Sequence, residues 1–186
     1  LASHADPDIL ASVNKWFVAS SCKVMISSLW TRFVPHLTTG KDNTHRILGI
    51  PDQGTVIRLG NSRLLALPAH FLHAEGNFQF YDPVSKILFS GDLGTSLIPH
   101  EQAAEPVTDF YSHVRHMEAF HRRYIVSRKV CRFWANMVRQ LDIEQIVPQH
   151  GARFVGRQAV QDFISWVEGL ECGVDLMTQN AYQVPN

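Results

Sequence analysis

Three short segments of the chain place histidine and aspartate side chains where they could bind a metal ion. The first is His4-Ala5-Asp6-Pro7-Asp8, in which the candidate ligands occupy alternate positions. The second contains His70 and His73 and is followed, after one expected hairpin, by Ser90-Gly91-Asp92. The third is Pro148-Gln149-His150-Gly151. Imidazole and carboxylate are donors that first-row transition metals take in proteins, so these segments indicate a metal site and leave its metal open.

Ordinary structural roles are the alternative for the same residues. Asp6 and Asp8 precede an apolar run with helical spacing, so both could be helix N-terminal residues stabilised by the helix dipole. Gly91-Asp92 could be a simple turn, and a single histidine at the start of a loop usually faces solvent or caps a helix. The spacing within each segment does not decide between these roles and metal binding.

Composition narrows the class of protein. A chain of 186 residues fits one ordinary domain, and 45% hydrophobic residues are enough for a core, which excludes general disorder. The 17 basic residues balance 17 acidic ones, which argues against nucleic-acid binding. No apolar stretch approaches the roughly 20 residues of a membrane-spanning helix, and no signal peptide is visible. Cys22, Cys131 and Cys172 lie far apart, which excludes a disulfide framework and a rubredoxin-like site and favours the cytoplasm.

The elements that must position the polar segments form a mixed α/β pattern. Helical spacing predicts helices over Ile9–Ala19, Ser28–Leu37, Val107–Leu141 with a break near Ile125, and Arg157–Leu170. Strands are predicted over Lys23–Ile26, Val56–Leu59, Arg63–Leu67, Phe78–Tyr81, Lys86–Phe89 and Gln145–Val147. The segment Asp82-Pro83-Val84-Ser85 is predicted to connect two of these strands as a hairpin. The pattern is therefore a run of adjacent strands with helices on both sides.

The order of the motifs resembles the metallo-β-lactamase superfamily. His-x-Asp-x-Asp is followed by a His, then, nineteen residues on, by the Asp of Phe-Ser-Gly-Asp, and finally by Pro-x-His-Gly. The segment from His73 to Asp92 is the most specific part. Within the superfamily it looks like the flavodiiron branch, particularly its stand-alone oxygen-binding diiron relatives. The resemblance runs from His4 to about Leu170, which is nearly the whole chain.

This resemblance implies an αββα metallo-β-lactamase sandwich, of which the chain holds the later portion, a four-strand run flanked by helices. We expect residues 1–186 to form a single diiron domain that is N-terminally truncated, because the chain opens at Leu1 without Met and almost nothing precedes His4. No flavodoxin or rubredoxin domain is expected, and therefore no FMN within this chain. Flavodiiron enzymes pair head to tail to bring flavin near iron, which suggests a homodimer, although this reason lapses without flavin.

The ligand set follows from the resemblance. His4, Asp6 and His73 would bind one iron ion, Asp8 and His150 the other, and Asp92 would bridge the two. Two further residues are assigned weaker roles. Tyr124 is a candidate hydrogen-bond donor to bound oxygen species, with an ordinary packed helix residue as the alternative, and His70, which lies off the nineteen-residue spacing, is interpreted as a supporting or structural residue.

Departures from the hydrolase pattern bear on the metal. A typical zinc hydrolase of the superfamily carries His-x-His-x-Asp-His, whereas here Asp6 occupies the second His position and Ile9 the last. A carboxylate in place of an imidazole hardens the site and favours iron over zinc. Ile9 supplies no ligand, so one metal is expected to keep an open position facing an apolar wall. Flavodiiron enzymes usually carry Glu where Asp6 stands, which is one methylene longer.

Three functions remain open from the sequence. The first is a diiron protein that binds or reduces dioxygen or nitric oxide, with electrons from a separate flavoprotein or rubredoxin. The second is an oxygen sensor that signals to a partner protein. The third is a zinc-dependent hydrolase of an ester or thioester that uses a metal-bound hydroxide. A basic stretch between Arg115 and Arg132 is predicted to be a solvated helix face, with a docking surface for an acidic redox partner as the alternative.

Overall fold

A six-stranded sheet forms the centre of the computed structural model, which describes residues 1–39 and 42–185. Its strands, in spatial order, are β3 (Thr55–Leu59), β4 (Ser62–Pro68), β5 (Phe78–Asp82), β6 (Ile87–Gly91), β7 (Gln145–Pro148) and β8 (Phe154–Val155). Strands β3 to β6 form an antiparallel meander, β7 joins β6 in parallel, and β8 closes the edge antiparallel to β7. The predicted run of four strands and the hairpin after β5 are confirmed.

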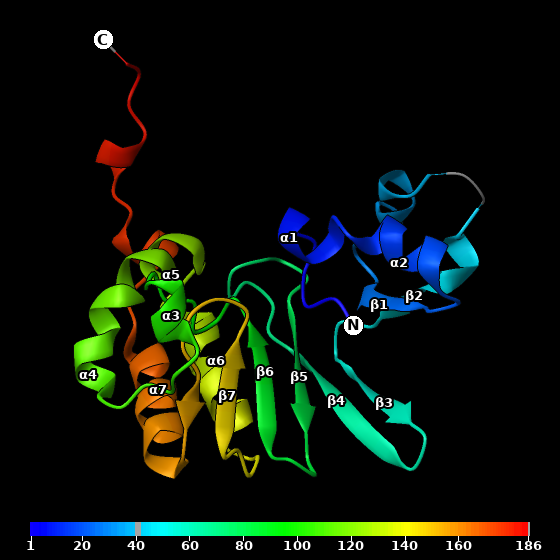
Figure 1. Ribbon diagram of the computed structural model, residues 1–186. Coiled ribbons are helices and arrows are strands. Elements are labelled where there is room, and N and C mark those ends of the chain that lie inside the picture. The colour runs from blue at the N-terminus through cyan, green and yellow to red at the C-terminus, as the bar shows by residue number, and fades with distance from the viewer. Residues whose placement is uncertain (40–41, 186) are drawn as a thin grey trace.

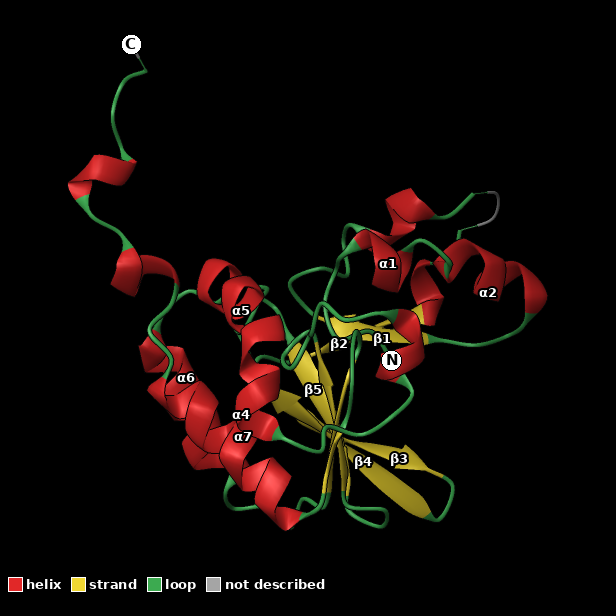
Figure 2. Cartoon of the chain, turned by 60° about the vertical axis from the view of Figure 1, so that its left-hand side comes forward, coloured by secondary structure: helices red, strands yellow, loops and turns green. Residues whose placement is uncertain are grey.

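Helices cover one face of this sheet (Figure 1, Figure 2). They are α3 (His100–Ala103), α4 (Phe110–His113), α5 (Glu118–Tyr124), α6 (Arg128–Val138) and α7 (Arg157–Gly169), with a 3-10 turn at Val114–His116. Helical structure was predicted over 107–141, and the expected break near Ile125 is confirmed, because α5 ends at Tyr124 and α6 begins at Arg128.

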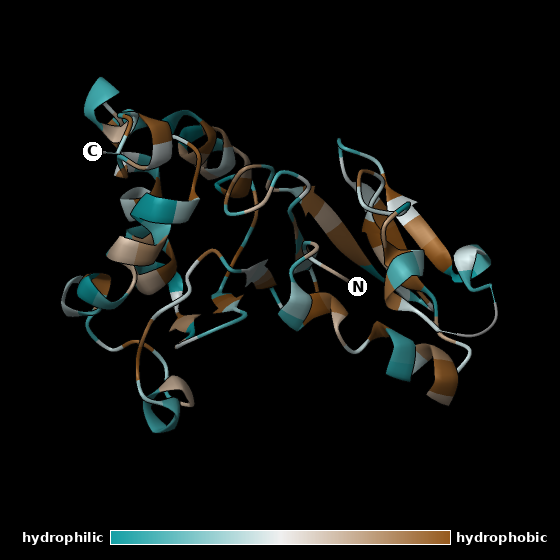
Figure 3. Ribbon diagram, turned by 90° about the horizontal axis from the view of Figure 1, so that it is seen from above, coloured by the Kyte–Doolittle hydropathy of each residue, from teal (hydrophilic) through white to brown (hydrophobic). Residues whose placement is uncertain are grey.

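A smaller layer lies on the other side of the sheet. It contains α1 (Pro7–Leu10), α2 (Val13–Ala19) and the parallel pair β1 (Val24–Ser27) and β2 (Ile47–Ile50), together with short 3-10 helices at Val34–Leu37 and Thr44–Arg46. Figure 3 shows the same separation from above, with the C terminus on the helical side. The N-terminal polar segment therefore approaches the main sheet from the side opposite to α4–α7.

Two local predictions in the smaller layer are wrong. The single helix expected over Ile9–Ala19 is divided into α1 and α2 by a turn at Ala11 and Ser12. The helix expected over Ser28–Leu37 is a series of turns that ends in the 3-10 helix. Pro35 has no N–H to donate to a preceding helical turn, which explains why an α-helix cannot run through this segment.

The main core lies between the sheet and α4–α7. Phe154 and Phe163 stack with ring centroids 4.5 Å apart, and both are fully buried. Between the layers, the buried Gln79 accepts a hydrogen bond from Trp134 Nε1 (2.7 Å) and donates one to the carbonyl of Ser90 (3.1 Å). Because a buried amide is costly unless its hydrogen bonds are satisfied, this contact fixes α6 against the end of β6, where the polar loop begins.

Beyond α7, short 3-10 helices at Gly173–Leu176 and Gln179–Ala181 lead the chain away from the body of the molecule (Figure 1). Within the described residues, no helix has both the length and the apolar character needed to cross a lipid bilayer.

Candidate metal centre

The ends of the central strands bring the polar segments together. Asp92 follows β6 directly, and His150 follows the parallel neighbour β7. These two loops are joined because the N–H of Gln149 donates to the carbonyl of Gly91 (2.7 Å). His73 lies in the connection from β4 to β5. Adjacent strand ends therefore supply three of the predicted ligands from one edge of the sheet.

The N-terminal segment reaches this edge because it is hydrogen-bonded on both sides. The N–H of Ala2 donates to the carbonyl of Met25 in β1 (2.9 Å), and the N–H of Phe78 at the start of β5 donates to the carbonyl of Ser3 (2.7 Å). The next residue, His4, is fully buried. The segment thus bridges the two layers and delivers its side chains to the strand ends.

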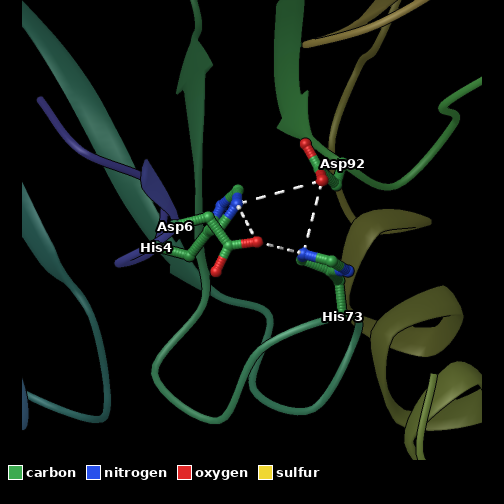
Figure 4. A group of neighbouring side chains, drawn as sticks. All are labelled: His4, Asp6, His73 and Asp92. Carbon is green, nitrogen blue, oxygen red and sulfur yellow. Dashed lines mark hydrogen bonds and ion pairs between the residues drawn. The ribbon is translucent and has the colours of Figure 1, made fainter. Parts of the chain in front are cut away.

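The first cluster contains His4, Asp6, His73 and Asp92, whose candidate ligand atoms all lie within 4.8 Å of one another (Figure 4). His73 Nε2 lies 2.9 Å from Asp6 Oδ2 and 3.3 Å from Asp92 Oδ2. His4 Nε2 lies 3.6 and 3.9 Å from the same two oxygens. Two imidazoles and carboxylates on one side of a metal are the donors of non-haem iron(II) sites. We call this group the inner cluster.

The second cluster contains Asp8, Asp92 and His150, and we call it the outer cluster. His150 Nε2 lies 2.9 Å from Asp8 Oδ2 and 4.0 Å from Asp92 Oδ1. The side chains of His150 and Asp8 are 49% and 44% exposed, whereas that of Asp92 is 7% exposed. The outer cluster is therefore more open to solvent than the inner one, in which His4 is completely buried.

Asp92 belongs to both clusters through different oxygens. Its Oδ2 faces His4 and His73, and its Oδ1 faces His150. A carboxylate with its oxygens on two separate donor sets can hold two cations at close range. The structure thus brings all six predicted ligands to one place, in the division into sets that the resemblance implies.

The protonation of two of these groups suits a cation. Burial lowers the pKa of His4 against the opposing influence of Asp92 and Asp6, so its imidazole is neutral at pH 7. Ser3 Oγ lies 2.9 Å from His4 Nδ1, which directs the free Nε2 lone pair toward the inner cluster. Partial burial raises the pKa of Asp8, but the hydrogen bond with His150, a backbone hydrogen bond and the nearby imidazoles together hold that pKa below the usual range. Neutral imidazole and ionised carboxylate are the forms that bind metals.

One buried atom on each side of the centre has no hydrogen-bond partner among the described residues. These atoms are His4 Nε2 in the inner cluster and Asp92 Oδ1, which faces the outer cluster. In the same part of the chain, no Lys or Arg forms an ion pair with Asp6, Asp8 or Asp92. Three carboxylates without a balancing cation, beside an unsatisfied buried imidazole, form a donor set that two divalent cations would satisfy.

Backbone strain marks the loop that carries His73. The φ angles of Phe71 and His73 are 65° and 109°, values that residues other than glycine rarely adopt. The surrounding hydrogen bonds hold this shape: the N–H of Phe71 donates to the carbonyl of Ala74 (2.8 Å), and Asn77 Nδ2 donates to the carbonyl of Leu72 (3.0 Å). Such strain is retained where the surrounding structure fixes it, and it is commonest at functional sites.

Tyr124 and His70 have different relations to the clusters. The Tyr124 ring centroid lies 5.5 Å from that of His73, and Phe120 stacks on the same imidazole at 5.5 Å. Tyr124 is 53% exposed, so it is a surface residue beside the centre rather than a packed interior one. His70 instead points away and donates from Nε2 to the carbonyl of Asp52 (2.8 Å), outside both clusters.

Sequence reasoning missed one supporting residue, His121. Its Nδ1 donates to the carbonyl of Met117 (2.8 Å), and its Nε2 accepts from the N–H of Gly94 (2.8 Å), two residues after Asp92. His121 is 1% exposed and packs edge-on against Trp166 with ring centroids 5.2 Å apart. It therefore supports the turn that presents Asp92. The sequence contains a signal for this, since His121 lies one helical turn after Met117 on the apolar side of α5.

His121 gives the folded protein a specific pH dependence. Burial lowers the pKa of His121 from 6.5 to about 4. Between these two values the imidazole is protonated in the unfolded chain and neutral in the folded one. The free energy of unfolding therefore decreases as the pH falls from about 6.5 to about 4, by about 3 kcal/mol in total.

Glutamine does not titrate in this range, so we expect the free energy of unfolding of His121→Gln to decrease less than that of the parent. Urea unfolding with a chelator present measures this. The exposed His100→Gln should match the parent, and equal pH slopes for parent and His121→Gln would contradict the assignment.

The fold and the site together define a class of protein. A mixed α/β fold, with a His/Asp centre supplied by an N-terminal His-x-Asp-x-Asp and by the loops after the central strands, is that of the metallo-β-lactamase superfamily. The sequence family described as ODP family beta lactamase matches residues 1–151, and this chain belongs to that family.

Solved structures agree with this assignment. The structure described as the peroxy diiron species of the chemotaxis sensor ODP is 38% identical, with a TM-score of 0.88 over 97% of this chain and 74% of that one. The apo state of chemotaxis sensor ODP from T. denticola is 39% identical, with the same TM-score over 97% and 72%. No curated protein gives a significant match in sequence.

Flavodiiron proteins share the fold at much lower identity. The rubredoxin:oxygen oxidoreductase of the anaerobe Desulfovibrio gigas is 17% identical, with a TM-score of 0.76 over 89% of this chain and 42% of that one. The flavodiiron protein from Giardia intestinalis is 18% identical, with a TM-score of 0.73 over 89% and 40%. These similarities establish the architecture, and the predicted flavodiiron-like fold is thereby confirmed.

Proposed function

We propose that this protein binds dioxygen at a diiron centre and acts as a sensor rather than as a reductase. In this proposal His4, Asp6 and His73 hold one iron ion, Asp8 and His150 hold the other, and Asp92 bridges them. The observation that carries the proposal is that the two oxygens of Asp92 face two separate donor sets. The likeness to a chemotaxis sensor with a diiron centre supports the choice of metal and role.

The donor chemistry favours iron over zinc. Carboxylates supply three of the six side chains, and the inner cluster combines two imidazoles with carboxylate oxygens. Two ferrous ions would supply two electrons and the coordination positions at which dioxygen binds. Neighbouring residues hold two of the proposed ligands in position. Ser3 fixes the orientation of His4, and His121 supports the turn after Asp92.

The surroundings of His73 limit access to the centre. Phe120 stacks on the imidazole of His73, and Tyr124 lies beside both rings, with its own ring centroid 4.8 Å from that of Phe120. This aromatic wall keeps water from one side of the inner cluster. Because Tyr124 is half exposed, it is positioned at the border between the wall and solvent, where its hydroxyl can donate a hydrogen bond to a small polar ligand.

Anaerobic loading with ferrous iron tests the proposal. We expect about two iron ions per chain and a visible charge-transfer band that appears on exposure to air and fades when the oxygen is removed. Without an added electron donor we expect no sustained oxygen consumption, and reduced rubredoxin or a reduced flavoprotein should not raise the rate. Sustained consumption with such a donor would instead indicate a reductase. A colourless protein that binds only zinc and cleaves an ester or thioester would indicate a hydrolase.

A further inference from the structure

Two buried cysteines lie outside the metal centre and take no part in the proposed function. Cys131 lies in the first turns of α6, and Cys172 follows α7. Both are fully buried, they are 41 positions apart in the sequence, and their sulfur atoms lie 3.9 Å apart. They were predicted from the sequence to be widely separated thiols with no disulfide framework, and the fold brings them together.

The backbone on either side of the pair is fixed. The N–H of Val174 donates to the carbonyl of Val126 (2.8 Å), just before α6. The carboxylate of Asp175 accepts from the N–H of Arg128 (2.6 Å) and from the N–H of Cys172 (3.2 Å). The start of α6 and the segment after α7 are therefore held against each other by one backbone hydrogen bond and by the Asp175 carboxylate, neither of which involves the two sulfur atoms.

We propose that Cys131 and Cys172 form a reversible disulfide when the protein meets hydrogen peroxide or a similarly small hydroperoxide. Closing the bond requires the sulfur atoms to approach from 3.9 Å to about 2.05 Å, and we infer that rotation of the two side chains about Cα–Cβ provides this approach. The hydrogen bonds described above keep the two residues within reach during this rotation. This inference rests on the thiol pair and is independent of the metal centre.

The reaction balances with the peroxide as the oxidant. The thiolate of one cysteine attacks a peroxide oxygen and breaks the O–O bond, and the leaving hydroxide takes up the proton that the thiol lost on ionisation, which gives a sulfenic acid and one water molecule. The second thiol then attacks the sulfenic sulfur, forms the S–S bond and releases the second water molecule. Two thiols and one hydrogen peroxide thus give one disulfide and two water molecules, and the sulfur pair loses two electrons to the peroxide oxygens.

The two thiols are not equivalent. The hydrogen bond between them lowers the pKa of the Cys172 thiol, whereas the same bond, together with burial, raises the pKa of the Cys131 thiol. The Cys172 side chain also accepts a hydrogen bond from the backbone N–H of Asp175, which favours a thiolate at Cys172, so we assign Cys172 as the attacking sulfur and Cys131 as the resolving one. Because both thiols are fully buried, the proposal requires an oxidant small and neutral enough to enter the packed interior, and a large charged one such as glutathione disulfide should not reach them.

The test uses a Cys22→Ser chain, in which the pair supplies the only thiols. The iron-loaded folded protein is treated with hydrogen peroxide, and catalase then removes the excess. The chain is unfolded in the presence of N-ethylmaleimide, which alkylates any free thiol, and its mass is measured by mass spectrometry. We expect loss of both N-ethylmaleimide adducts and a mass about 2 Da below that of the reduced chain, with both adducts restored by dithiothreitol. The cross-link should also raise the thermal midpoint by about 5 °C.

The controls separate this reaction from other oxidation. Removing iron with a chelator should leave the rate unchanged, and dependence on iron would overturn direct attack by peroxide. Glutathione disulfide should leave the folded chain reduced. Adding Cys172→Ser should leave Cys131 as a single thiol that never shows the 2 Da loss. Two free thiols after peroxide treatment, or added oxygen without a disulfide, would refute the proposal.

Discussion

Asp92→Asn is expected to retain at most one iron ion per chain, whereas Tyr124→Phe should retain two. Among the residues that the structure describes, Asp92 is the only side chain shared by the two clusters, and its carboxylate is 7% exposed. Asparagine keeps the size and one oxygen but removes the negative charge that offsets the repulsion between two divalent ions. That repulsion is magnified where the effective dielectric constant is low. Iron per chain, measured after anaerobic loading and gel filtration, checks the result.

The comparison with Tyr124→Phe separates loss of a bridge from general damage near the centre. Tyr124 lies beside His73, so its substitution changes the surroundings of the inner cluster without removing a proposed ligand. Circular dichroism and thermal unfolding of both variants without metal should match those of the parent, since the hydrogen bonds of the turn after β6 are kept. A fully loaded Asp92→Asn protein with the parent's response to air would refute the bridging role.

Strands β3 to β7 of the main sheet could be predicted because their apolar alternation and turn residues are local properties of the sequence. The two-residue strand β8 (Phe154–Val155) was not predicted, since it is too short to show a pattern. β2 (Ile47–Ile50) was not predicted either, since Gly49 interrupts a short run and the strand exists only by pairing with β1. At Gly49 the backbone lies so close to the turn after β1 that a Cβ would be 2.6 Å from Ser28 Oγ. A long-range contact therefore determines this strand.

The metal centre shows the same division between local and long-range information. Residue types identified His4, Asp6 and His73 as candidates, but their convergence depends on strand pairing that no spacing encodes, and only the resemblance supplied it. The helix N-terminal position considered for Asp6 is confirmed, but a capping role for its side chain is not. Asp6 is the N-cap residue of α1, yet its side chain makes no capping hydrogen bond and instead meets His73 at 2.9 Å. His121 acts through a backbone amide and therefore belongs to no ligand motif, so its position on the apolar side of α5 is its one signal in the sequence.

The two clusters differ in ways that should make their metal ions leave at different rates. The inner cluster has four donor side chains, including the fully buried His4, whereas the outer cluster has three. In the outer cluster His150 is 49% exposed, so water and chelators reach it directly. A more exposed site with fewer protein ligands holds its ion less tightly. Chelation of the parent protein is therefore expected to proceed in two phases, the fast one from the outer cluster.

His150→Ala is expected to remove the fast phase and to leave about one iron ion per chain. An iron affinity at the outer cluster that is about tenfold lower is enough to give this result. The reason is that Asp8 and one oxygen of Asp92 would remain as the only protein ligands there, while the inner cluster would keep all four. His70→Ala is the matched control, because His70 contacts the carbonyl of Asp52 outside both clusters, and it should retain two ions and both phases. Iron release to a coloured chelator, followed after mixing, measures both properties. If His150→Ala kept the fast phase, or if His70→Ala lost it, the division of ligands between the two clusters would be wrong.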